Sequence, residues 1–137
     1  DIMLDNNNYN GISVGINGIR ALANDMLSWP KNYGRDLSKD IMKLFDPIQL
    51  QTLATQRKWF STFLLSASAI LNDSRLKNCS DLLNAICENW VIVRNMLVKA
   101  GKQNTEEILP RISKRIIDIS DEEEKCAKTL RGWVDTI

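Results

Sequence analysis

Apolar residues recur along most of this chain at spacings of three and four, the period of a helix that buries one face. The first stripe comprises Ile12, Ile16, Ile19, Ala23 and Met26. Further stripes occupy residues 47–71, 79–101, 105–116 and 120–137. No segment shows the two-residue alternation that is typical of a half-buried strand. The pattern therefore predicts an all-α protein.

Prolines, glycines and capping residues divide these stripes into helices. Asp46 followed by proline predicts a helix start, and Pro47–Leu71 contains no later breaker. Apolar residues surround most of that helix, so we expect it to be central and mostly buried. A tight corner at Trp90–Val91 and a C-terminal cap at Gly101 predict two helices between residues 79 and 101.

Shorter helices are expected on either side of these. One is capped by Asp36 or Ser38 and ends at Phe45, and another begins at Thr105 and is interrupted by Pro110. Ser120, with Glu123 three residues later, forms a capping box that predicts a separate closing helix up to residue 137. The total is a compact bundle or superhelix of about six to seven helices.

The 137 residues are enough for one domain with its own core, which we expect over residues 12–137 behind a flexible polar leader at 1–11. The absence of Met at position 1 indicates a segment of a longer protein. The tryptophans are expected to pack in the core, as is Phe63; they are Trp29, Trp59, Trp90 and Trp133.

The composition excludes several classes of function. The net charge of +1 gives no global field for nucleic acid or a membrane surface, and no apolar run approaches the roughly 18 residues of a membrane span. There is no histidine, which removes histidine triads and the usual catalytic zinc sites. Cys79, Cys87 and Cys126 have no metal-binding spacing and indicate structural thiols in a reduced, intracellular protein. We expect no enzyme activity, no cofactor and no metal.

Residues 91–119 carry an excess of basic side chains, namely Arg94, Lys99, Lys102, Arg111, Lys114 and Arg115. These residues form either an ordinary solvated helix surface or a basic rim that meets an acidic peptide. No aromatic residue is interleaved with them, so a stacking platform for single-stranded nucleic acid is not expected.

Three consecutive segments carry a family resemblance: "LLNAICENWVIVRNMLVKAG", "NTEEILPRISKRI" and "SDEEEKCAKTLRGWVDTI". Their order resembles the N-terminal domain of the transcription elongation factor TFIIS, a module also found in elongin A and LEDGF. The matching apolar places are Val93, Met96, Leu97, Ile108, Ile112, Ala127, Leu130, Trp133 and Ile137. Over residues 12–137 the order is most similar to the longer version in the nuclear targeting subunit of protein phosphatase 1.

The resemblance implies a right-handed helical bundle with extra N-terminal helices. It also implies a non-catalytic nuclear scaffold that binds short, disordered, acidic–hydrophobic segments of transcription or RNA-processing factors, and that joins a phosphatase complex through the rest of its parent chain. By position, the binding loops would be residues 72–76 and 115–119. The binding residues implied are Asn72, Asp73, Arg75, Leu76, Lys114, Arg115, Ile117 and Ile119.

Three alternatives stay open. "ENWVIVRN" resembles the corner of viral Bcl-2-like proteins, with Val91 where that family has glycine. A fragment of a HEAT or armadillo solenoid is a second alternative. A nucleic-acid-binding helical domain is a third, favoured only by the bases of residues 94–115.

Overall fold

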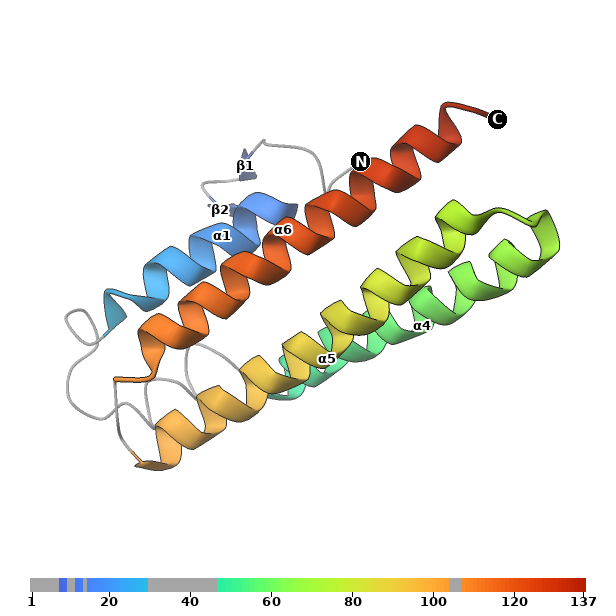
Figure 1. Ribbon diagram of the computed structural model, residues 1–137. Coiled ribbons are helices and arrows are strands. Elements are labelled where there is room, and N and C mark those ends of the chain that lie inside the picture. The colour runs from blue at the N-terminus through green and yellow to red at the C-terminus, as the bar shows by residue number, and fades with distance from the viewer. Residues whose placement is uncertain (1–7, 10–11, 14, 30–46, 104–106) are drawn as a thin grey trace.

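The structure is a computed structural model that describes residues 8–9, 12–13, 15–29, 47–103 and 107–137 (Figure 1). Within them are four α-helices: α1 (Gly15–Met26), α4 (Pro47–Leu71), α5 (Ser74–Gln103) and α6 (Leu109–Val134). The two-residue strands β1 (Asn8–Tyr9) and β2 (Ile12–Ser13) pair antiparallel. The prediction of an all-helical bundle is confirmed, but the described residues do not form six to seven helices.

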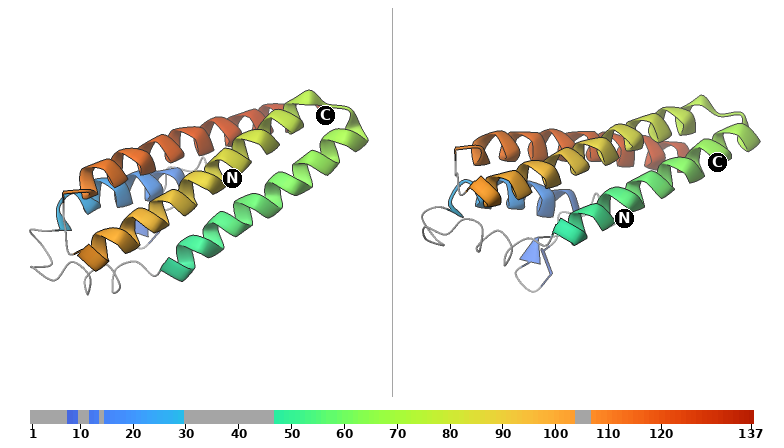
Figure 2. Two further views of the ribbon diagram at one scale, coloured as in Figure 1. Left: turned by 60° about the horizontal axis from the view of Figure 1, so that its bottom comes forward. Right: turned by 90° about the horizontal axis from the view of Figure 1, so that it is seen from below.

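The three long helices follow one another as antiparallel hairpins, with α5 between α4 and α6 (Figure 2). α1 packs on α6 and runs antiparallel to it. Arg20 reaches Asp121 and Glu124, whereas the backbone oxygen of Ala23, further along α1, accepts a hydrogen bond from Ser113. α1 therefore covers only the N-terminal part of α6, which positions the site described below.

A two-residue turn closes the α4–α5 hairpin. Asn72 has a φ of 51°, in the left-handed region that asparagine tolerates better than most residues. Asp73 then caps α5, because its Oδ1 accepts the backbone N–H of Arg75 at 2.9 Å. Its Oδ2 accepts the indole N–H of Trp133 at 2.8 Å, which ties this turn to the end of α6.

The predicted corner at Trp90–Val91 is wrong. α5 continues through it, because Trp90 and Val93, 1% and 0% exposed, lie on the same buried stripe as the residues before them. Gly101 is not a cap either, since it is buried inside α5, which ends at Gln103. The two helices predicted over residues 79–101 are therefore one.

The two helices predicted after residue 105 are also one. Ser120 is buried in the middle of α6, where its hydroxyl donates to the backbone oxygen of Ile117 at 2.6 Å and accepts from Arg20 Nε at 3.2 Å. It therefore caps nothing. Pro110 lies in the first turn of α6, where a missing N–H breaks no helical hydrogen bond. The predicted short helix at 36–45 and the predicted cap at Thr105 lie outside the described residues.

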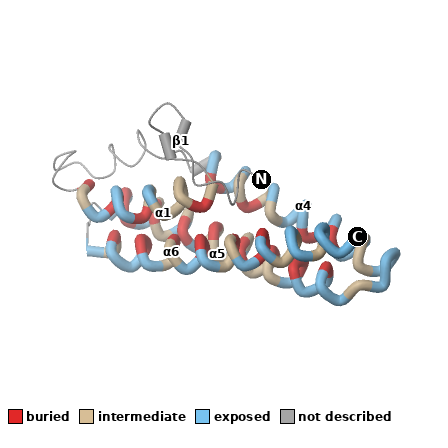
Figure 3. The backbone as a smooth tube through the Cα atoms, turned by 90° about the horizontal axis from the view of Figure 1, so that it is seen from above, coloured by how far each residue is buried: buried red, intermediate tan, exposed pale blue. Residues whose placement is uncertain are grey.

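One continuous core joins all four helices. Trp29 and Trp90 are core residues, as predicted, and Trp133 is partly buried against the core. The prediction for α4 is wrong: Trp59 is 69% exposed and Phe63 64%, and much of this helix is pale blue in Figure 3. The reason is that α4 packs on α5 along a single face.

None of the helices in the described ranges is long and apolar enough to cross a membrane.

Candidate functional site

An apolar groove lies between α4 and the C-terminal part of α6, with α5 beneath it. Its volume is about 650 Å³, within the range of about 300–1,000 Å³ that is usual for ligand clefts. Its apolar lining consists of Phe60 from α4, Leu83 from α5, and Cys126, Ala127, Leu130 and Val134 from α6.

The groove exists because α1 is much shorter than α6. The groove-lining residues of α6 recur at spacings of three and four, so they share one face; they are Glu123, Cys126, Ala127, Leu130, Arg131 and Val134. Arg20, near the start of α1, reaches Glu124 at 2.6 Å. Beyond Glu124, no helix in the described part of the chain occupies the space between α6 and α4.

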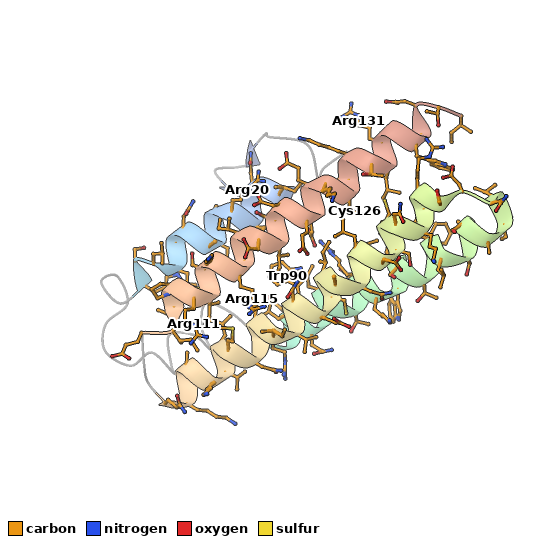
Figure 4. The ribbon with its side chains drawn as sticks, in the orientation of Figure 1. Arg20, Trp90, Arg111, Arg115, Cys126 and Arg131 are labelled. Carbon is orange, nitrogen blue, oxygen red and sulfur yellow. The ribbon has the colours of Figure 1, made fainter. Side chains whose placement is uncertain are left out.

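A buried ion pair closes one end of the groove. Arg57 of α4 donates through Nε and Nη2 to the two carboxylate oxygens of Glu123, at 2.8 and 3.2 Å. The Glu123 side chain is 1% exposed and also accepts the indole N–H of Trp90 at 3.3 Å. Trp90 lies between α5 and α6 in Figure 4. This network fixes the spacing of all three helices at the groove and leaves no free carboxylate oxygen there.

The thiol in the groove wall is held neutral. Burial, chiefly, and the neighbouring Cys79 raise the pKa of the Cys126 thiol to about 12. Burial also raises the pKa of Cys79, whose sulfur contacts the backbone oxygen of Cys126 at 4.0 Å. A thiol that stays protonated at neutral pH is a poor nucleophile and a poor metal ligand. The described residues hold no group of three His, Cys, Asp or Glu side chains that could bind a metal ion.

One exposed cation stands at the edge of the groove. Arg131 lines the groove near the end of α6 and makes no salt bridge with any described residue (Figure 4). Lys128, one turn earlier, pairs instead with Glu124 at 3.0 Å. The arrangement is thus an apolar floor with one available positive charge at its margin, suited to a ligand with apolar and acidic groups.

The chain matches the model of a protein family described as a domain of unknown function, DUF4872, over residues 3–130. The chain belongs to the DUF4872 family. No curated protein and no solved structure matches it. The matched span reaches Leu130 and so includes most of the groove lining.

The first predicted binding segment of this DUF4872 domain is the turn between α4 and α5. Asn72 shapes that turn, and Asp73 and Arg75 form an ion pair of 2.7 Å with each other. The Arg75 guanidinium, with the Arg75 backbone N–H and the Trp133 indole, holds the pKa of Asp73 well below its usual range. Leu76 is 2% exposed and belongs to the core, so it offers no apolar seat for a peptide.

The second predicted segment, residues 115–119, is not a loop, so that prediction is wrong. It lies inside α6, with Ile119 buried at 1% exposure and Ile117 partly buried against the core. Lys114 is exposed, whereas Arg115 donates to Asn89 Oδ1 at 3.2 Å.

The two predicted segments are not brought together. The α4–α5 turn contacts Trp133, which lies nineteen residues along α6 from Lys114, or about 28 Å at the rise of an α-helix. The predicted binding site therefore divides into two distant places, neither of which is the groove.

The groove itself was not expected from the sequence, although one signal for it was present. The stripe through Cys126, Ala127 and Leu130 is evident in the sequence, and such a stripe by itself predicts a face that packs on the core. The stripe gives no information on the length of α1, and that length decides whether this face of α6 is covered.

Proposed function

We propose that this DUF4872 domain is a non-catalytic protein-interaction module. Its groove takes up an amphipathic helix that folds from a short, disordered, acidic–hydrophobic segment. One observation carries the proposal: the open place between α4 and α6, which begins beyond the N-terminal end of α1. A helix laid there completes the bundle around α5 and buries the exposed apolar face.

The dimensions of the groove support a short helical ligand. The lining residues of α6 run from Glu123 to Val134, about 16 Å at the rise of an α-helix. Three turns of helix fill that length and present apolar side chains at i, i+3, i+4 and i+7. Phe60 and Val134, 43% and 56% exposed, provide apolar surface that a ligand would remove from water.

The charges support an acidic partner. Arg131 is the exposed cation at the groove margin, and the Glu123 carboxylate is already held by Arg57 and Trp90. An acidic residue in the solvent-facing part of the ligand would meet Arg131 and be attracted over a Debye length of about 8 Å. Ordering a disordered segment costs free energy, so micromolar affinity is expected.

The setting of this module is a proposal that rests on sequence resemblance. A nuclear scaffold for transcription, RNA-processing or phosphatase complexes is the role implied by the TFIIS-like order of segments. The proposed ligand is the type of peptide that the resemblance implies. The groove is proposed as its binding site in place of residues 72–76 and 115–119.

The proposal is tested by selecting 16-residue peptides from a random display library. Their affinity is then measured for the unchanged protein and for two variants. Ala127→Trp fills the groove, while Ala69→Trp adds the same side chain at an exposed position of α4 away from it. Enriched peptides should carry acidic residues and apolar residues at helical spacing. Their binding should weaken at least about tenfold in Ala127→Trp only, since lost packing of about 1.4 kcal/mol has that effect.

The charge arrangement supplies a second, matched pair. Arg131→Glu should weaken the same peptides and reduce their salt dependence, whereas Arg111→Glu, at the other end of α6 (Figure 4), should not. Peptides that bind Ala127→Trp as well as the unchanged protein would refute the proposed site. Failure to enrich any peptide, together with tight and strongly salt-dependent DNA binding, would favour the nucleic-acid alternative.

A further inference from the structure

The side of α4 that faces away from α5 has the features of a second interaction surface, in addition to the groove. Six positions recur along it at spacings of 4, 3, 4, 3 and 4 residues, and all six are exposed. We refer to this set as the outer seam; it comprises Thr52, Gln56, Trp59, Phe63, Ser66 and Ile70. Alternating spacings of three and four are the pattern of the helix face that meets a partner helix in a coiled coil.

The outer seam leaves unusually large apolar side chains in water. Trp59 is 69% exposed, Phe63 64% and Ile70 81%. They lie opposite the face that packs on α5, which contains Leu50 and Leu64, 2% and 4% exposed. Large apolar side chains gathered on one helix face indicate an interaction surface, unlike single apolar residues scattered over a surface.

The seam itself contains no charged residue, although Arg94 of α5 lines a hollow beside its members Thr52, Gln56 and Trp59. Arg57 and Lys58 are the charged residues of α4, and both are directed elsewhere. Arg57 pairs with Glu123, and Lys58 Nζ donates to Asn84 Oδ1 of α5 at 2.9 Å. Aromatic enrichment without charge is the composition of an interface centre. Because the seam residues themselves carry no charge, the seam does not repel a copy of itself, which favours self-association.

The order of residues in the seam fits a second copy in one particular orientation. The spacings read the same in both directions, so two antiparallel α4 helices bring their seams into register. Trp59 then meets Phe63 of the second copy, Thr52 meets Ile70, and Gln56 meets Ser66. The rings of Trp59 and Phe63 pair with each other, and Gln56 and Ser66 face each other, where they can form a hydrogen bond.

We propose that the outer seam of α4 binds the α4 of a second copy of this chain, antiparallel and with two-fold symmetry. At roughly 200 Å² for each large side chain, Trp59, Phe63, Ile70 and the flanking Phe60 and Leu71 leave about 600 Å² of apolar surface in water. With the polar members of the seam, the area approaches the roughly 800 Å² per partner of a standard interface.

This surface overlaps the groove along one edge, because Gln56 belongs to the seam and also lines the groove. Phe60 lines the groove, and its ring stacks on that of Phe63, with centroids 6.3 Å apart. Ala127 of α6 lines the groove and is not part of the seam. A variant at Phe63 therefore tests association of two copies, and a variant at Ala127 tests the peptide site.

The test is the mass of the 137-residue chain in solution, measured by sedimentation equilibrium over a range of concentrations. The unchanged protein should form a particle of twice its 15.6 kDa. Phe63→Glu should weaken the dimer at least about 100-fold, because it places an unpaired charge in the centre of the interface. Leu65→Glu is the matched control: Leu65 is 49% exposed on the same helix but off the seam, and this variant should remain dimeric.

Orientation is tested by disulfide formation between single-cysteine additions. In a mixture, the Gln56→Cys and Ser66→Cys proteins should cross-link to each other. Two copies of Ser66→Cys should not cross-link, although they would do so if the α4 helices were parallel. An unchanged protein that stays monomeric up to about 100 µM would overturn the proposal. Equal weakening of the dimer by Phe63→Glu and Leu65→Glu would also overturn it, as would disulfide formation between two copies of Ser66→Cys.

Discussion

Removing the Glu123 carboxylate should destabilise the protein more than most single changes. In Glu123→Ala, the Arg57 guanidinium loses both of its 2.8 and 3.2 Å hydrogen bonds, and the Trp90 indole N–H loses its acceptor. Breaking one side of a buried pair costs about 3–5 kcal/mol. The Arg57 side chain is 20% exposed and can partly regain water, so we expect the lower half of that range, about 3–4 kcal/mol.

Replacing both partners should cost much less. Arg57→Met with Glu123→Leu leaves no buried charge, and such replacements are often neutral or stabilising. The double variant should therefore be within about 1.5 kcal/mol of the unchanged protein, allowing for the unpaired Trp90 N–H. Its difference from the sum of the two single variants measures the coupling.

The free energy of unfolding is measured by urea denaturation monitored by circular dichroism. Variants are compared where the slope of that free energy against urea concentration is the same. A Glu123→Ala variant that loses less than about 1 kcal/mol would refute the argument that this pair is desolvated and sets the spacing of α4, α5 and α6. So would a double variant as unstable as the two single variants added together.

Two further predictions concern acid and thiol chemistry. The Arg75 guanidinium lowers the pKa of Asp73 in the folded state, so this carboxylate stabilises the fold above its ordinary pKa of about 4, and its contribution is lost as the pH falls below that value. The melting temperature measured from pH 6 to pH 2 should fall less steeply for Asp73→Asn than for the unchanged protein, and parallel curves would contradict this. Cys87 is the half-buried thiol, while burial raises the pKa of Cys79 and, to about 12, that of Cys126. At pH 8 a disulfide reagent should label one thiol quickly and the other two only on unfolding, and rapid labelling of three would contradict the packing.

Helix starts and stops that depend on local chemistry could be predicted from the sequence. α4 begins at Pro47 after Asp46 and ends at Leu71, as the capping pattern indicates. Ser120 with Glu123 has the same local pattern as a capping box, yet both side chains are buried inside α6. Arg20 and Arg57 meet them there from other helices, and those long-range partners are not visible in a local pattern.

The candidate site could be predicted less well than the helices. α4 carries apolar residues on two faces, and only its contact with α5 decides that Leu64 is buried while Phe63 stays exposed. A helix with apolar residues all round normally indicates burial, so Trp59 was expected in the core. The groove depends on where the N-terminal end of α1 lies along α6, which is a property of tertiary packing and not of any one stripe.

The central claim is tested most directly by an amide NMR titration with a peptide from the library selection. If the groove is the binding site, the largest shift changes should fall on Leu83, Ala127 and Leu130, which line it on α5 and α6. Shifts centred on residues 114–119 instead, with the groove residues unchanged, would contradict the account.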